Sequence, residues 1–323
     1  MDLKEITKPI KDELDIFDNN FHQAMRSKVA FVDLIARYIV KQKGKRIRPA
    51  LVLLSAKACG EINESTYRGA SLVEILHTAT LIHDDVVDEA DTRRGFPSIN
   101  SIWKNKIAVL MGDYMLSKGL LLSLDNNDFQ FLKITSYAVR RMSEAEILQT
   151  KKSRDLNIDE ETYLKIILDK TASLFETCCE IGAASVSKDT ETHQKMREFG
   201  ENLGMVFQIR DDLLDYIGRK SITGKPTGLD MKEKKLTLPL IHSLANAPQN
   251  KSKEIITIIK KGAKKCELQR VVEFVHEFGG IDYTIKKARQ YSELAKKSLQ
   301  SISYSEAKES LVRFIGFVME RTK

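Results

Sequence analysis

The chain has 323 residues, of which 42% are hydrophobic and 7% aromatic, and its formal net charge is +7. Its six prolines and 16 glycines are too few for an architecture of short strands and frequent turns, which excludes most all-β folds. We expect a single all-α domain over residues 1–323, because no stretch has the composition of a linker.

Apolar periodicity predicts a succession of helices along the chain. It favours helices at 18–42, 47–60, 66–90, 105–125, 129–153, 159–187, 191–217 and 235–247, then three or four shorter ones between 251 and 320. No proline lies between Pro97 and Pro226, as expected for long helices. The glycine-punctuated segment 218–228 is the clearest loop, and its Lys225 suggests a flap over a binding site.

The N-terminus and the cysteines favour a reduced, cytoplasmic protein. Residues 1–5 are partly acidic and precede no apolar core, so they do not form a signal peptide. The four cysteines show neither metal-ligand spacing nor a disulfide framework. No run of about 18 uncharged residues occurs, so we expect no membrane-spanning helix.

Basic residues cluster at 41–48, 219–235 and 251–265, which suits a polyanionic ligand. No zinc-finger, RNP or basic-zipper pattern accompanies them, so we expect no nucleic-acid partner. Diphosphate groups explain the first two clusters better. The third is expected to be solvated surface or a contact with anionic lipid.

One acidic pattern occurs twice, as Asp84-Asp85-Val-Val-Asp88 and Asp211-Asp212-Leu-Leu-Asp215. On a helix, the first and last aspartates lie one turn apart and the second about 100° round, so each copy gathers three carboxylates that repel one another. A single copy of such a pattern is more often just the solvent-exposed polar face of an amphipathic helix. Two matched copies favour Mg²⁺, which binds carboxylates and is usually shared with substrate phosphates.

Cations accompany both acidic motifs. A basic turn, Gly44-Lys45-Arg46-Ile47-Arg48-Pro49, could present Lys45 and Arg48 to an anion, whereas we expect Arg46 to be solvated. Arg93 and Arg94 follow the first motif, where a helix-ending salt-bridge cluster is an equally good interpretation.

The second half of the chain has a parallel set, in which each residue alone could be a core polar group or ordinary surface. Its members are Lys170, Thr171, Gln208, Lys225 and Lys235. His77 lies two turns before Asp84 and so on the same flank, although a core histidine is the commoner explanation.

Together these segments resemble the all-trans polyprenyl diphosphate synthases, the isoprenoid chain-elongating family, over nearly the whole chain. The resemblance implies an isoprenoid-synthase fold with helices around a central cavity. It implies that Lys45, Arg48, His77 and Arg94 hold the diphosphate of isopentenyl diphosphate. It assigns the allylic diphosphate to Arg93, Lys170, Lys225 and Lys235, with Thr171 and Gln208 at the reacting end.

The resemblance also implies a metal-dependent condensation without a side-chain nucleophile. Three Mg²⁺ ions would bind the diphosphate with the substrate present, on Asp84, Asp85, Asp88, Asp211 and Asp215, and Asp212 completes the catalytic set. The allylic diphosphate would leave as pyrophosphate, and the double bond of isopentenyl diphosphate would attack the resulting cation. The family implies a homodimer, and a transient membrane-surface contact would serve product release.

Other functions remain open at this point. A class I terpene cyclase shares the first acidic motif but differs in the second, and a non-catalytic prenyltransferase subunit should have lost aspartates that this chain retains. A short-chain farnesyl or geranylgeranyl diphosphate synthase is the main alternative for the product. A nucleic-acid or membrane-surface binder would differ from all of these by an affinity that simply falls with salt.

Product length is predicted from the helical turn before the first motif. Ala79 and Thr80 are small, so the cavity floor is expected to be open there, with Leu76 or a residue on a facing helix as the stop one turn deeper. In the family, small residues here accompany longer products. We therefore expect a product of about C30 to C50, with C40 favoured, for a quinone side chain. Helix packing is the alternative interpretation of Ala79.

Overall fold

The computed structural model describes residues 2–42, 44–217, 231, 234–262 and 265–321. The first half contains α1 (Leu3–Ile6), the 3₁₀ turn η1 (Lys8–Ile10), α2 (Lys11–Met25), α3 (Ala30–Lys41), α4 (Ile47–Cys59), α5 (Glu64–Val87), β1 (Thr92–Arg93), β2 (Phe96–Pro97), α6 (Ile99–Leu124) and α7 (Phe129–Asp155). The second half contains α8 (Glu160–Ile167), the π-helical segment η2 (Leu168–Ala172), α9 (Ser173–Val186), α10 (Thr190–Ile217), α13 (Leu238–Asn246), α14 (Gln249–Lys260), α15 (Lys265–Glu277), α16 (Gly280–Ser298) and α17 (Glu306–Glu320). The all-α fold is confirmed.

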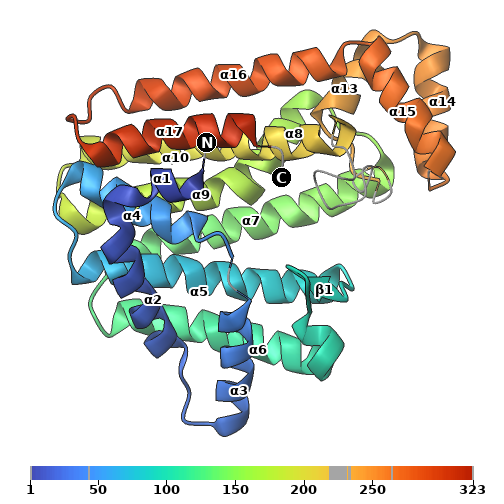
Figure 1. Ribbon diagram of the computed structural model, residues 1–323. Coiled ribbons are helices and arrows are strands. Elements are labelled where there is room, and N and C mark those ends of the chain that lie inside the picture. The colour runs from blue at the N-terminus through green and yellow to red at the C-terminus, as the bar shows by residue number, and fades with distance from the viewer. Residues whose placement is uncertain (1, 43, 218–230, 232–233, 263–264, 322–323) are drawn as a thin grey trace.

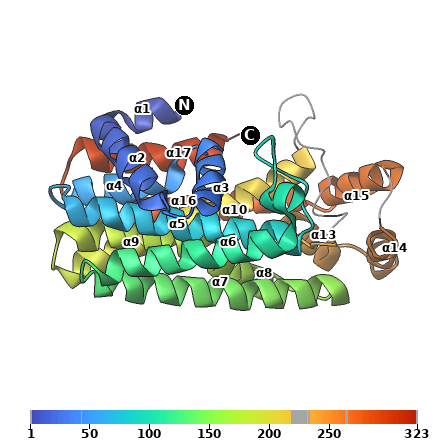
Figure 2. The same ribbon diagram turned by 90° about the horizontal axis from the view of Figure 1, so that it is seen from below.

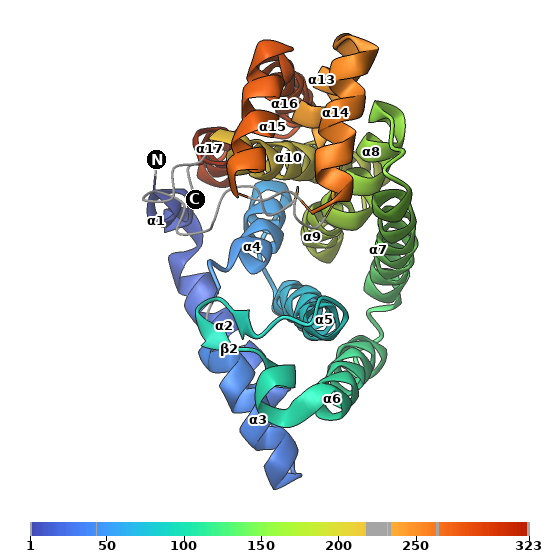
Figure 3. The same cartoon turned by 90° about the vertical axis from the view of Figure 1, so that its right-hand side faces the viewer.

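The helices form a bundle around α5. Figure 3 looks along the bundle and shows α5 surrounded by α4, α2, α6 and α9, with α7 beside α6 and α9 and with α10 beyond α9. Figure 1 shows α16 and α17 running alongside α10, and α13 to α15 grouped at one end. Helix α4 is buried almost all round, as expected for the innermost position of an apolar helix. Figure 2 shows α6 and α7 on the outer face of the bundle.

The predicted helix at 18–42 is two helices. Between α2 and α3, the Ser27 N–H donates to the Asp33 carboxylate at 3.2 Å and the Val29 N–H donates to the Ser27 hydroxyl at 3.2 Å. Such short-range side-chain bonds satisfy backbone groups without a continuous helix. The other predicted helices are confirmed to within a few residues.

Two local features near the acidic motifs were not predicted. Helix α5 ends at Val87, and a two-stranded hairpin follows, with Thr92 opposite Pro97. Arg94 and Gly95 form its turn with φ of 53° and 80°, the left-handed values that a two-residue hairpin turn needs. The predicted helix at 159–187 contains the π-helical η2, a distortion that often marks a functional site.

Helix α6 carries an exposed apolar face. By length and composition alone it could cross a membrane, and 33% of its most apolar window is buried. Core helices of proteins that span no membrane pass the same test, so the expectation of no membrane-spanning helix stays a prediction. Among the described residues, α6 is the one helix of this kind.

Candidate active site

The second acidic motif is joined to η2 by a line of hydrogen bonds. The Thr171 hydroxyl donates to Gln208 Oε1 at 2.8 Å, and Gln208 Nε2 donates to Asp212 Oδ1 at 2.6 Å. The buried Tyr163 hydroxyl donates to the other Asp212 oxygen at 2.7 Å. Both carboxylate oxygens of Asp212 therefore bind protein groups, so this aspartate orders its neighbours rather than facing solvent.

Lys170 lies beside Thr171 and points towards α7. Its ammonium donates to Gln149 Oε1 at 2.6 Å and forms an ion pair with Glu146 Oε2 at 2.5 Å. Lys170, Thr171, Gln208, Asp212 and Lys235 line one cleft. The structure thus brings together most of the residues predicted for the allylic diphosphate in the second half of the chain. Lys225, predicted for the same role, lies outside the described residues.

The first acidic motif occupies the C-terminal end of α5. Asp85 is buried, and its Oδ1 accepts from Arg93 Nε at 2.7 Å. The Asp88 side chain is exposed at the helix end. Burial raises the pKa of Asp84, as do the charges of Glu146 and Asp88, against the opposing effect of Lys170. Asp84 therefore lies within electrostatic reach of the η2 cluster and has excess negative charge around it.

Asp211, the first residue of the second motif, faces the C-terminal tail. Arg321 Nη2 lies 3.4 Å from Asp211 Oδ1, and the Arg321 guanidinium lies 4.6 Å from the centre of the Phe207 ring. The Arg321 carbonyl accepts from Arg210 Nη2 at 3.3 Å. Arg321 thus reaches the second acidic motif. Asp215 is half-buried one turn further along α10.

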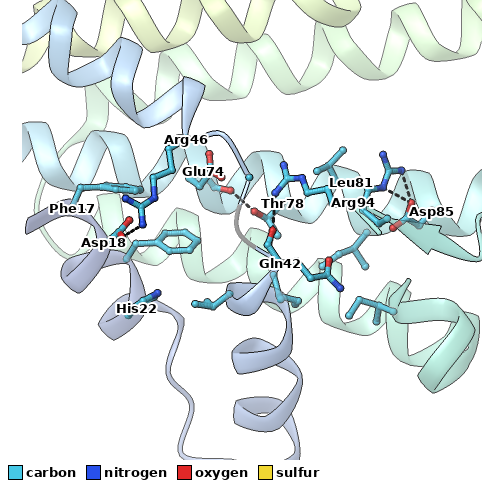
Figure 4. A pocket seen from close by; sticks show the side chains of 17 residues that line it. Phe17, Asp18, His22, Gln42, Arg46, Glu74, Thr78, Leu81, Asp85 and Arg94 are labelled. Carbon is cyan, nitrogen blue, oxygen red and sulfur yellow. Dashed lines mark hydrogen bonds and ion pairs between the residues drawn. The ribbon is translucent and has the colours of Figure 1, made fainter. Parts of the chain in front are cut away.

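A second pocket lies between the basic turn and the hairpin (Figure 4). Arg94 Nη1 donates to the Gln42 carbonyl at 3.1 Å, and a Cβ on Gly44 would lie only 2.6 Å from that same nitrogen. The glycine therefore lets the Arg94 guanidinium pack on the turn. Asp85, Arg93 and Arg94 all line this pocket, so the two basic segments predicted to share a diphosphate do meet.

Arg48 supplies a buried donor to the same region. Its Nε atom is buried and has no hydrogen-bond partner among the described residues. Burial lowers the pKa of Arg48, and Glu74 on α5 counters this. Burial also lowers the pKa of His77 well below its usual value, with Arg48 and Arg94 acting in the same direction. A buried cationic group with a vacant donor suits an anionic ligand.

The turn itself differs from expectation at one residue. Arg46 is not simply solvated: it forms an ion pair with Asp18 of α2, and its backbone is left-handed with φ of 54°. Lys45 is exposed, as a residue that meets a ligand from solvent would be. Glu74 was missed in the sequence, although a carboxylate in an otherwise apolar helix, three residues before His77, was a visible signal.

A small, nearly closed apolar cavity lies below the first motif, with about 10 Å³ open to a sphere the size of a water molecule. It is enclosed by α5, α7 and α9, and its walls are Val73, Leu76, His77, Thr80, Thr135, Ala138, Val139, Met142, Leu174 and Thr177. Leu76 and Thr80 are thus on the cavity as predicted. Ala79 is not among these walls. It is fully buried in another cluster, with Ile75, Ala108 and Met111, because neighbouring residues on a helix point about 100° apart.

No three His, Cys, Asp or Glu side chains of the described residues already converge on a metal position. The aspartate motifs lie at the same end of the bundle, where α5 and α10 both finish (Figure 1). Asp84 of the first motif lies within electrostatic reach of Lys170, and hydrogen bonds run from the neighbouring Thr171 through Gln208 to Asp212 of the second. The site therefore has two acidic edges, cations on both sides and an apolar cavity beneath.

Comparison with known proteins decides the family. The model of the family described as polyprenyl synthetase matches residues 29–275. The chain belongs to the polyprenyl synthetase family. It is a trans-prenyltransferase, and its likeness to relatives covers the whole length. An all-trans-nonaprenyl-diphosphate synthase of Rhodobacter capsulatus, described as geranyl-diphosphate specific, is 35% identical over 319 residues, 98% of each chain. A geranylgeranyl diphosphate synthase of Saccharolobus solfataricus is 34% identical over 290 residues, 87% of each chain.

A solved structure shows the same fold. The polyprenyl synthase of Caulobacter crescentus, crystallised with calcium and isoprenyl diphosphate, superposes with a TM-score of 0.91 at 32% identity and covers 100% of this chain and 98% of its own. The isoprenoid-synthase fold expected for this polyprenyl synthetase is thereby confirmed. Relatives of nearly equal identity differ in their named products, so membership of the family leaves product length open.

Proposed function

We propose that this trans-prenyltransferase condenses isopentenyl diphosphate onto an allylic diphosphate and releases a long-chain polyprenyl diphosphate of about C40, suited to a quinone side chain. The observation that carries the proposal is the placement of Lys170, Thr171 and Gln208 between the two acidic motifs. The pocket of Figure 4, here called the arginine pocket because Arg46, Arg93 and Arg94 line it, lies beside the first motif. The cleft that contains Lys170 and Lys235 is a different one, so we assign the two diphosphates to separate sites.

The residues fit Mg²⁺ on two grounds. Burial raises the pKa of Asp84, and the charges of Glu146 and Asp88 raise it further, so a cation there would relieve repulsion; Asp211 already has the Arg321 cation beside it. Asp84, Asp88, Asp211 and Asp215 are the carboxylates we assign to the metal. Asp85 and Asp212 are engaged by protein groups and orient the site. When bound, Mg²⁺ supplies charge neutralisation to the departing diphosphate.

The protein groups account for the remaining steps. Lys170, Arg93 and Lys235 bind the allylic diphosphate, whose C1–O bond breaks to release pyrophosphate. The double bond of isopentenyl diphosphate, held by Lys45, Arg48 and Arg94, forms the new bond to C1. A proton then leaves C2 of the former isopentenyl unit for pyrophosphate, which restores a double bond. The Thr171 hydroxyl lies beside this centre, and the apolar cavity excludes water from the cation.

The direct test is to incubate the purified protein with labelled isopentenyl diphosphate, farnesyl diphosphate and Mg²⁺ and to size the products. Labelled products longer than the primer are expected, with the longest species near C40. Cyclised hydrocarbons would instead favour a terpene cyclase, and products that stop at C20 would favour the short-chain alternative.

The arginine pocket predicts a split between the two substrates. We expect Lys45→Ala and Arg48→Ala to raise the KM for isopentenyl diphosphate about ten- to a hundredfold, as for the loss of one charge-assisted hydrogen bond, and to leave the allylic KM nearly unchanged. Lys57→Ala is the control on α4, because Glu13 already neutralises that side chain and it does not line the pocket. Equal rises in both KM values would mean that the turn merely sets the local potential.

We propose further that the protein is a homodimer and that a second copy covers the outer face of α6 and α7. Large apolar side chains are exposed along these helices: Ile102, Val109, Leu110, Leu120, Leu121, Leu124, Phe129, Tyr137 and Ile147. An apolar surface of this extent is unusual on a monomer and marks an interaction site. A second copy would place two such faces against each other by two-fold symmetry.

This proposal predicts that the double variant Leu110→Glu, Leu121→Glu is monomeric. Light scattering after size exclusion should give twice 36.7 kDa for the unchanged protein and 36.7 kDa for the variant. Tyr304→Glu is the control, because this residue is 81% exposed and belongs to the segment between α16 and α17 rather than to α6 or α7. A wild-type monomer that co-sediments with lipid vesicles would instead assign the face to a membrane surface.

A further inference from the structure

Lys170 is held by two residues that lie outside the sequence motifs described above. Glu146 and Gln149 lie three residues apart on α7, so they share one face of that helix. Both bind the Lys170 ammonium, at 2.5 and 2.6 Å. An ammonium has three N–H donors and no acceptor. With two donors fixed, the direction of the third is set before any substrate arrives.

The surroundings require such support. Lys170 lies within the π-helical η2, where the regular backbone register of the helix is interrupted. The next contact along the same junction is also made by α7: Arg141 Nε donates to Asp169 Oδ1 at 2.7 Å. Helix α7 therefore clamps η2 at two successive residues. The Arg141 contact holds the Asp169 side chain, and the Glu146 contact holds the Lys170 side chain.

Glu146 also lies near the first acidic motif. Its charge raises the pKa of Asp84, while Lys170 lowers it, so the carboxylate and the ammonium both lie within electrostatic reach of Asp84 on α5. Glu146 and Lys170 are 38% and 32% exposed in their side chains, so both remain open to a ligand from solvent. A lysine left to itself would lose much rotamer freedom on binding phosphate.

We propose that Glu146 is a positioning residue for the allylic diphosphate, which holds the Lys170 ammonium so that its third N–H points at the ligand. This inference rests on the proposed function, in which Lys170 binds that diphosphate. Gln149 contributes the second, uncharged contact. Glu146 acts through Lys170, so its effect depends on the lysine being present.

The test compares Glu146→Gln with the wild-type enzyme and with Glu144→Gln. Glu144 is the matched control: it lies on the same helix two residues earlier, and its partner is Arg140 at 4.0 Å on the outer surface. We expect Glu146→Gln to raise the allylic KM about tenfold, as for one charge-assisted contact that is no longer oriented, and to leave the KM for isopentenyl diphosphate within about twofold. Glu144→Gln should change neither.

A double-mutant cycle separates positioning from a general effect. In a Lys170→Gln background, Glu146→Gln should have no further effect on the allylic KM. An equal effect in both backgrounds, an unchanged allylic KM, or the same change in Glu144→Gln would each overturn the inference while the wild-type enzyme still elongates. A wild-type protein without elongating activity would refute the proposed function instead, so the two failures are distinct.

Discussion

Asp84→Ala and Asp211→Ala should each reduce turnover by a factor on the order of a thousand or more, while the folded protein melts within about 2 °C of wild type. The pKa of Asp84 is raised in the fold, so its ionised form destabilises the folded state at neutral pH, and removal of the carboxylate relieves this cost. Asp211→Ala loses one partly exposed ion pair with Arg321, and pairs of that kind contribute about 1 kcal/mol or less.

Asp212→Ala is the matched comparison, because it alters the neighbouring residue of the same motif. It removes both acceptors from Tyr163 and Gln208, and a buried donor left without a partner costs about 1 to 3 kcal/mol. This variant should melt clearly lower than Asp211→Ala. If Asp84→Ala and Asp211→Ala also melted lower, with activity lost only in proportion to folded protein, both aspartates would be structural.

A ligand-dependent melt completes this test without any turnover. Mg²⁺ with pyrophosphate should stabilise the wild-type protein by about 2.7 kcal/mol at a hundredfold excess over Kd, through preferential binding to the folded state. Asp84→Ala and Asp211→Ala should lose most of this stabilisation. A wild-type melting temperature that is unchanged by Mg²⁺ and pyrophosphate would contradict the assignment of the aspartates to metal and diphosphate.

Phe131→Ala should lengthen the products, and Thr80→Phe should shorten them to about C15 or C20. Thr80 lines the cavity one helical turn below Asp84. A phenyl ring at this position would therefore block the cavity close to the first acidic motif. The lower end is defined by three residues, each one turn below a wall residue: Gly69 below Val73, Phe131 below Thr135 and Ile181 below Thr177. A Cβ on Gly69 would lie 2.5 Å from Ile181 Cγ2 and 3.3 Å from Phe131 Cε2, so the three helices close there.

The position of this closure bears on product length. Gly69 precedes Asp84 by 15 residues, or about 22 Å along α5, and each turn of about 5.4 Å approximates one extended isoprene unit. Only about four units fit above the closure, so a product near C40 requires Phe131 to move aside. Removal of its ring should therefore shift the product ladder upwards by one or more units.

Product ratios are the measurement, because they do not depend on how much enzyme is folded. Phe131→Ala is expected to cost about 3 to 5 kcal/mol of stability, so Phe131→Leu serves as the milder variant. Phe31→Ala is the control, since Phe31 lies on α3, is 47% exposed and belongs neither to the cavity wall nor to the proposed dimer face. Thr80→Val should keep the wild-type ladder. Unchanged ladders in folded Thr80→Phe and Phe131→Leu enzymes would show that the product takes another path.

Much of the site was visible in the sequence. The two acidic motifs, the basic turn and the Lys170-Thr171 pair are short patterns whose spacing follows from helix geometry, and the long helices follow from apolar periodicity. These are local properties of the chain. The all-α fold and the membership of the prenyltransferase family followed from them and were confirmed.

Only the tertiary structure decided which residues of each motif bind other protein groups and which face the site or the cavity. Asp85 and Asp212 are engaged by Arg93 and Tyr163, contacts that no spacing predicts. Ala79 faces α6 while Thr80 faces the cavity, because helix packing sets the rotation of α5 and one residue turns the side chain by about 100°. Glu146 reaches Lys170 across 24 residues of chain only because α7 packs on η2. Residues distant in sequence acquire a common role when helices dock, and a linear pattern does not record that docking.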